Sequence, residues 1–320
     1  MQRADDAKEL LPLFDAVFAR PADDAPRQVL SDALLERGDA RGEFISLQLR
    51  EARGIATPAQ RTRAANLLKH HVRRWLIEVP GLARNSLEFD RGFLRAAALE
   101  PTGLISASPF WRTIERLHLR QTQYAPEELK SPHLTRLDTL TGVDPRALTL
   151  LLAGPDKPAL RELVFASDDV KPTKQEEVLA LTRFRALEVL EITPRPWMHH
   201  AERMSWLFDS ALARQLRRLA LRIDPPWDIF GLHAQLDVHR LERLQIEPVT
   251  IGLRMSFDRQ SLSVRFDDAS AFDRHAQTLR NLAPRFAPHP FSRFDLRIAD
   301  RRATRAELER LGELFLRHAS

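Results

Sequence analysis

Cysteine is absent from the 320 residues of the chain. A disulfide, a thiolate zinc site, an iron–sulfur cluster and a cysteine nucleophile are therefore excluded. Apolar runs are also short, since none approaches the ~18 residues that a membrane helix needs, and the polar, acidic N-terminus is unlike a signal peptide. With 43% hydrophobic residues the chain can nevertheless bury a sizeable core. We expect a folded, soluble, cytoplasmic protein.

Lysine is scarce, because only six of the 49 basic residues are lysines and the rest are arginines. Against 44 acidic residues the net charge is +5, so acids and bases nearly cancel over most of the chain. The exception is the stretch from Arg61 to Ile77, which holds five basic residues and no acid. These five residues are a candidate nucleic-acid-binding set: Arg61, Arg63, Lys69, Arg73 and Arg74.

Motifs of catalysis are missing as well. The chain has no glycine-rich phosphate loop, no G-x-S-x-G elbow, no H-E-x-x-H and no dinucleotide fingerprint. The adjacent pair His70-His71 does not easily bind one metal, because neighbouring side chains on a helix point about 100° apart, and the pair His199-His200 lacks a third ligand at metal spacing. We therefore predict a protein that is not an enzyme and that holds no metal or cofactor.

The first ninety residues show helical spacing of apolar side chains. The pattern predicts a helix that ends at Arg20, before Pro21, because a residue that precedes proline is pushed out of the helical region. A second helix begins after Asp23 or Asp24 and closes at Gly38. Two more are expected over about 42–53 and 59–78.

The segment Glu36-Arg-Gly-Asp-Ala-Arg-Gly-Glu-Phe44 resembles the repeat-companion domain of bacteria, although Leu30 and Ala33 replace a tyrosine and a tryptophan of the usual pattern. That domain typically precedes leucine-rich or similar repeats, and it carries no agreed biochemical activity. The resemblance implies a helical repeat-companion cap over residues 1–85.

From residue 86 onward one pattern recurs: apolar, two polar, apolar, one polar, apolar. The second apolar positions of six copies are separated by 20, 26, 27, 29 and 25 residues, and they are Leu117, Leu137, Leu163, Leu190, Leu219 and Leu244. Such steps are typical of leucine-rich repeats, in which each unit of about 20–29 residues supplies one short strand. Looser copies are centred on Val264 and Phe294.

We therefore predict an α/β protein, with an irregular leucine-rich-repeat solenoid over residues 86–320 that ends in a capping helix. Its parallel sheet would form the concave side, with the six leucines in a single buried column, and its helices would form the convex side. Helices are expected over 145–153, 173–181, 201–213, 269–282 and 304–317.

The outward face of these strands is mixed in charge. Mixed charges with frequent arginine suit a protein partner better than a nucleic acid, which needs a uniform basic field and stacking aromatics. Alternatively, the face is merely solvated. The candidate protein-binding residues of this face are Arg116, His118, Arg120, Arg136, Glu191, Arg218, Arg222, Arg243, Gln245 and Arg265.

Trp197 and Trp227 follow consecutive strands and are candidate anchors on the strand-exit rim; the alternative is that both fold inward. Together these features predict a bacterial adaptor, scaffold or inhibitor that binds, and thereby regulates, another protein. The rival hypothesis is nucleic-acid binding by the basic helix.

Overall fold

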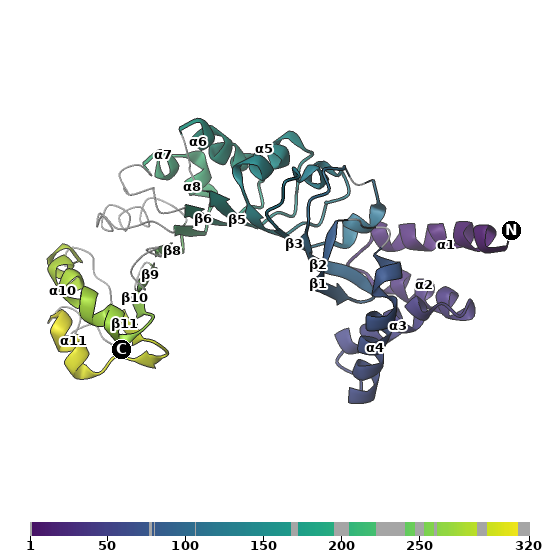
Figure 1. The fold of residues 1–320 in the computed structure, drawn as a ribbon, viewed down its shortest axis with the longest axis horizontal. Helices are drawn as coiled ribbons and strands as arrows, with labels where there is room; N and C mark the ends of the chain where they lie inside the picture. Colours follow the sequence, from purple (N-terminus) through teal and green to yellow (C-terminus); the bar gives the residue numbers. More distant parts are fainter. Residues whose placement is uncertain are drawn as a thin grey trace. The chain divides into compact units, whose positions relative to one another are not determined.

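The computed structural model describes residues 2–76, 79, 81–105, 107–167, 172–194, 205–221, 241–246, 253–258, 261–286 and 293–312. The chain divides into two compact units, whose helices and strands are labelled in Figure 1. Unit 1 holds residues 1–142 and 149–160, and unit 2 holds residues 143–148 and 161–320. Each unit is described by itself below.

Unit 1 begins with four helices at the predicted places: α1 (Gln2–Ala19), α2 (Asp24–Glu36), α3 (Ala40–Ala52) and α4 (Pro58–Trp75). Capping side chains explain where they start. Asp23 accepts a hydrogen bond from the amide of Ala25 at 2.9 Å, and Asp39 accepts one from the amide of Arg41 at 2.9 Å. Gly38 follows α2 with a φ of 68°, a left-handed conformation that favours glycine.

The sheet of unit 1 starts with a hairpin. Strands β1 (Leu82–Asp90) and β2 (Phe93–Leu99) pair antiparallel, whereas β3 (Arg116–Leu119) and β4 (Thr139–Val143) continue the sheet in parallel. Short 3-10 helices, η1 (Pro109–Thr113) and η2 (Glu127–Lys130), precede β3 and β4. The predicted boundary between residues 85 and 86 falls inside β1, so the cap region contains the start of the first strand.

The helices and the hairpin share one core. Phe93 of β2 packs in the same buried cluster as Val17 of α1, Leu30 of α2 and Ile45 of α3. The side chain of Gln48 also joins α3 to the hairpin turn, because its Oε1 accepts from the amide of Gly92 at 2.7 Å and its Nε2 donates to the carbonyl of Phe89 at 3.4 Å. The hairpin therefore depends on the helical cap for burial and for hydrogen bonding.

Two arginines of the N-terminal helices are buried. The guanidinium of Arg41 lies over the rings of Phe14, Phe93 and Phe110 at 5.2, 5.2 and 4.9 Å. Arg27 donates to the carbonyls of Pro21 and Asp23. Burial lowers the pKa of Arg27 to about 10. Both side chains therefore belong to the packing of the cap: Arg41 joins α3 to α1 and β2, and Arg27 holds the segment before α2.

The position of β4 differs from the predicted repeat centred on Leu137. Leu140, and not Leu137, lies opposite Leu117, although Leu137 is buried in the preceding turn. The rung that begins at Leu137 has Gly142 at its third apolar position, where φ is 73° and a Cβ atom would clash with the carbonyl of Leu119. Because this glycine stands at an apolar position of the pattern, residues 134–139 match the repeat pattern better than the residues of β4 do.

The strands of unit 2 neighbour one another in the sheet in the same order as they occur in the chain. The strands are β5 (Glu162–Ser167), β6 (Val189–Pro194), β7 (Arg218–Leu221), β8 (Arg243–Ile246), β9 (Leu253–Phe257), β10 (Ser261–Phe266), β11 (Arg293–Ile298) and β12 (Arg301–Arg302). Described helical segments of unit 2 are α6 (Pro172–Leu179), η3 (Ala180–Arg183), α7 (Ser205–Phe208), α8 (Ala211–Gln215), α10 (Ala269–Phe286) and α11 (Arg305–Leu311), whereas α5 (Pro145–Ala153) is divided between the two units. Helices α6 to α8 lie on one side of strands β5 to β8 (Figure 1).

The first four of these strands are parallel and in register. Their pairing places four of the predicted leucines in one buried column: Leu163, Leu190, Leu219 and Leu244. Burying each leucine contributes about 1.5–3 kcal/mol. This part of the predicted column is confirmed.

The C-terminal strands depart from the prediction of a purely parallel sheet. The unpredicted strand β9 pairs antiparallel with both β8 and β10. Strands β10 and β11 are parallel, but Val264 lies opposite Leu296 rather than Phe294. The chain is thus an α/β protein whose described strands are mostly parallel and do not close into a barrel. Every described helix is too short or too polar to cross a bilayer.

Gly42 provides a test of how tightly α2 and α3 pack. A Cβ atom there would lie 2.7 Å from the carbonyl oxygen of Ser31 and from the amide nitrogen of Leu35, both of which are backbone atoms. We expect Gly42→Ala to lower the free energy of unfolding by about 1–3 kcal/mol, because the helices must separate. Urea titration followed by circular dichroism measures this loss.

Gly54 supplies the control, since its surroundings are open and its φ is 72°. Asparagine tolerates this left-handed conformation, so Gly54→Asn should change stability little. Equal losses for the two variants would contradict the close-packing explanation.

Candidate protein-binding surface

Strand β3 of unit 1 alternates as predicted. Arg116 and His118 are exposed, whereas Leu117 and Leu119 are buried. Arg116 forms an ion pair with Glu88 of β1, and the Nδ1 atom of His118 lies 2.9 Å from the hydroxyl of Thr141 on β4. The outward side chains of this sheet are therefore connected laterally, from strand to strand.

Glu115, which the sequence did not single out, lies at the centre of a second lateral network. It accepts from Arg95 of β2 at 2.7 Å and also from Arg136. The hydrogen bond to Glu115 raises the pKa of Arg95. Arg136 was predicted to lie on a strand, but it stands in the turn before β4, because the strand begins three residues later than the pattern suggested.

Arg120 lies just past the end of β3. Its guanidinium forms an ion pair with Glu100, which lies just past β2, at 2.8 Å. These two residues belong to the strand exits and not to the sheet face itself.

Unit 2 presents two outward rows on its parallel strands. The register aligns Glu162, Val189, Arg218 and Arg243 in one row, and Val164, Glu191, Ala220 and Gln245 in the other. Arg218 donates to Glu162 at 3.2 Å across the intervening strand. Surface ion pairs of this kind contribute about 0–1 kcal/mol each, so they organise the face more than they stabilise it.

Three predicted binding residues, Arg222, Trp197 and Trp227, lie outside the described residues. Arg265 is placed on β10, where it faces outward and donates to Asp300 at 2.6 Å.

The basic helix α4 is less one-sided in space than in sequence. All five basic residues are exposed, but three of them form ion pairs with acids that precede α4 in the chain. Arg63 binds both carboxylate oxygens of Glu43 at 2.8 Å. Arg61 and Arg74 pair with Glu51 and Asp39 at 3.7 and 3.4 Å.

The pKa of Glu43 is lowered, and that of Arg63 is raised, mainly by their mutual hydrogen bonds. The charge of the stretch 61–77 is thus offset largely by acids from the preceding helical segment. This offset weakens the positive field on which the nucleic-acid hypothesis depends.

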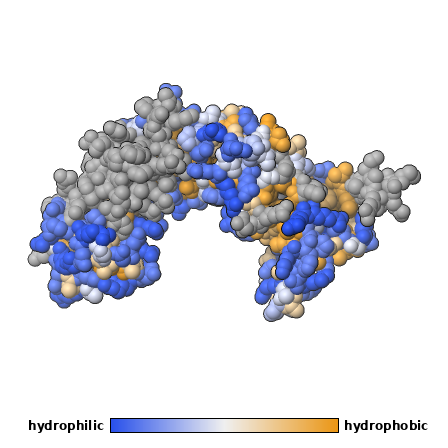
Figure 2. Space-filling view, viewed as in Figure 1, coloured by the Kyte–Doolittle hydropathy of each residue, from blue (hydrophilic) through white to orange (hydrophobic). Residues whose placement is uncertain are grey.

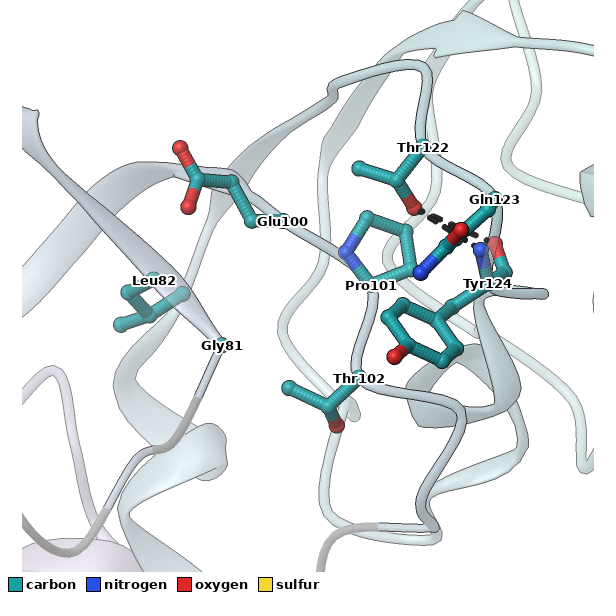
Figure 3. Close-up of a pocket in the computed structure, with 8 residues that line it drawn as sticks. All are labelled: Gly81, Leu82, Glu100, Pro101, Thr102, Thr122, Gln123 and Tyr124. Carbon is teal, nitrogen blue, oxygen red and sulfur yellow. Dashed lines mark hydrogen bonds between the residues drawn. The ribbon is translucent and has the colours of Figure 1, made fainter.

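A pocket of about 910 Å³ opens where β1 begins and where β2 and β3 end (Figure 3). Its lining residues are Gly81, Leu82, Glu100, Pro101, Thr102, Thr122, Gln123 and Tyr124. The ring of Tyr124 lies beside Pro101 and Thr102, and the amide of Tyr124 donates to the hydroxyl of Thr122 at 3.2 Å. Behind Thr102, the buried carboxylate of Glu128 accepts from its amide at 2.8 Å. The loop that carries Thr102 is therefore held in place.

Large apolar side chains are exposed at this strand-exit rim. Leu104, Ile105 and Tyr124 are 66%, 59% and 53% exposed. A Cβ atom at Gly103 would lie 3.8 Å from the Tyr124 ring, which places the two loops side by side. Sequence reasoning missed these residues, although an apolar pair between Gly103 and Ser106 and the only tyrosine of the chain were available signals.

The C-terminal helix α11 begins with a strongly acidic carboxyl group. Glu307 accepts from Arg301 at 2.7 and 2.9 Å and from the amide of Thr304 at 2.7 Å. These bonds, that from Arg301 above all, lower the pKa of Glu307 from 4.5 to about 2. Among the described residues, no three histidine, aspartate or glutamate side chains gather as metal ligands.

Comparisons of the chain with models of protein families, with curated proteins and with solved structures find no match.

The carboxyl group of Glu307 predicts a pH dependence of stability. The unfolded chain binds its proton near pH 4.5, whereas the folded chain binds it near pH 2. Its stabilisation is therefore complete above pH 4.5 and is lost as the pH falls toward about 2. We expect Glu307→Gln to flatten the fall of Tm over this range, as measured by thermal unfolding at several pH values.

The control is Glu309→Gln, which removes a carboxylate from an exposed pair with Arg305. If both substitutions flatten the curve equally, the effect does not come from the bonds that hold Glu307.

Proposed function

We propose that the chain is a leucine-rich-repeat protein with an N-terminal repeat-companion cap, and that it binds another protein without being an enzyme. Support for the repeat architecture comes from strands that neighbour each other in chain order and from the leucine column of β5 to β8. The cap closes the first hairpin through Phe93 and Gln48, as a terminal unit of a repeat array must do.

The exposed rim of unit 1 carries the proposal of protein binding. Three large apolar side chains are exposed together at this rim, Leu104, Ile105 and Tyr124, and a pocket lies directly beside them. Clustered exposed apolar side chains mark binding surfaces more often than single ones do. Tyrosine is frequent among the residues that dominate binding energy at protein interfaces. Rigid strands hold the loops, so the rim is ordered before a partner arrives.

A protein suits these surfaces better than a nucleic acid. The ion pairs Arg116–Glu88, Arg120–Glu100 and Arg218–Glu162 leave no uniform positive field on the described sheet faces. Arg61, Arg63 and Arg74 of α4 are likewise partnered by acids. In this proposal, binding at these surfaces is itself the regulatory event, and no chemical reaction is involved.

Removal of the rim's apolar side chains tests the proposal. We expect Leu104→Ser, Ile105→Ser and Tyr124→Ala, combined, to reduce capture of the partner from extracts of the host by about tenfold or more, since loss of a central aromatic costs 2 kcal/mol or more. Quantitative mass spectrometry of the captured proteins measures the reduction.

A matched control changes exposed apolar residues elsewhere on unit 1. Val29 and Ile55 are 55% and 59% exposed, and Val29→Ser with Ile55→Ser should leave capture unchanged. As Tyr124 is the only tyrosine, nitration of the protein reports on this site alone. A captured partner that leaves Tyr124 fully open to nitration would exclude the rim as its binding site.

A further inference from the structure

A buried carboxylate holds the loop that leads from β2 to η1. Glu128 of η2 is only 1% exposed, and its Oε1 atom accepts two hydrogen bonds from Thr102, one from the amide at 2.8 Å and one from the hydroxyl at 2.5 Å. Leu104 and Ile105, the exposed apolar residues of this loop, follow Thr102 by two and three positions. The two bonds therefore help to set where these apolar side chains lie.

The segment that carries Glu128 is itself fixed within unit 1. The amide of Ser131 donates to the carbonyl of Glu128 at 2.9 Å, and the carbonyl of Ser131 accepts from the buried Nζ of Lys157 at 3.1 Å. Thr102, by contrast, is only half-buried. The loop, and not η2, is therefore the element that moves when the two bonds break.

The same loop supports the aromatic residue of the rim. The ring of Tyr124 lies beside Pro101 and Thr102 (Figure 3), and a Cβ atom at Gly103 would lie 3.8 Å from it. Figure 2 shows hydrophobic patches on the surface of unit 1. Movement of the loop would therefore displace all three exposed apolar side chains of the rim relative to one another.

A carboxylate is a costly group to place at this buried position. Burial of an ionised group is unfavourable unless hydrogen bonds satisfy it, and no donor among the described residues reaches the Oε2 atom of Glu128. Apolar residues of similar volume often replace buried charges without loss of stability. Stability alone therefore gives little reason for a glutamate here, whereas the position of the loop does.

We propose that Glu128 is the positioning residue of the rim: through Thr102 it holds the apolar side chains in the arrangement that the partner binds. The proposal rests on the proposed function and adds how its site is kept ready for binding. Because the loop is ordered in advance, association does not include the entropic cost of ordering it. Glu128 acts only through Thr102, since its own side chain is buried.

Hydrogen exchange of the Thr102 amide tests the proposal on the full chain. Glu128→Met removes the acceptor while nearly keeping the volume of the side chain, and Glu128→Gln keeps a neutral acceptor oxygen. We expect the amide to exchange about tenfold or more faster in Glu128→Met and less so in Glu128→Gln, because hydrogen bonds to a charged acceptor are the stronger ones. The Tm of Glu128→Met should not fall, since the half-buried amide turns to water and a buried carboxylate is removed.

The only tyrosine of the chain provides a second measurement. Labelling with 3-fluorotyrosine gives one fluorine resonance, from Tyr124. In Glu128→Met this resonance should broaden or split, because the loop then exchanges between closed and open forms. Capture of the partner found with the rim experiment should fall with the fraction of closed loop, in the order parent chain, Glu128→Gln, Glu128→Met.

Glu127→Met is the matched control, because Glu127 precedes Glu128 in η2 but pairs with Lys130 at 2.7 Å. It should leave Thr102 exchange, the fluorine resonance and capture unchanged. Circular dichroism shows that each variant is folded, and Glu128→Gln carries the same test if Glu128→Met is not. The proposal is overturned if Thr102 stays protected without the carboxylate, if capture stays at the parental level although the loop opens, or if the control has the same effect.

These results are separable from those for the rim. If the rim variants lose the partner while Glu128→Met opens the loop and retains the partner fully, protein binding at the rim stands and the positioning role of Glu128 fails. If the rim variants retain the partner, binding at the rim is rejected, whatever Glu128 does to the loop.

Discussion

One-sided burial of short strands is the constraint on which the rest of the structure depends. Leu163, Leu190, Leu219 and Leu244 align because successive side chains of a strand point to opposite faces and because each strand follows its predecessor in register. A single strand of four to six residues buries too little to be stable, so each leucine gains its contacts only from its neighbours. The same alternation fixes the opposite face, where charged and polar side chains must point outward. Stability and surface chemistry are therefore two results of one pattern.

The outward face is organised by lateral contacts. On unit 1, Arg116 reaches Glu88, and Glu115 connects Arg95 to Arg136. On the parallel strands of unit 2, Arg218 reaches Glu162.

The helical cap and the hairpin solve the problem of the exposed first strand. Edge strands invite unwanted pairing unless another element covers them. Phe89 of β1 packs against Phe44 of α3 at a ring distance of 5.7 Å, and Gln48 satisfies both ends of the hairpin turn. The segment of residues 36–44 thus has a structural explanation in packing. Arg41, for example, is held among three phenylalanine rings.

Local patterns in the sequence were sufficient for the first four helices, for a cap of the second helix at Asp23, and for the leucine column of β5 to β8, because capping and alternation act over a few residues. Tertiary structure decided what depends on distant neighbours. The sequence pattern did not predict β4 correctly, because its third apolar position is Gly142, where the carbonyl of Leu119 leaves no room for a side chain. The side-by-side positions of four arginines follow only from strands that pair in space: Arg254, Arg265, Arg297 and Arg302. The charge of α4 was likewise offset by acids of earlier segments. Periodicity fixes which way a side chain faces, whereas only the folded chain determines what lies beside it.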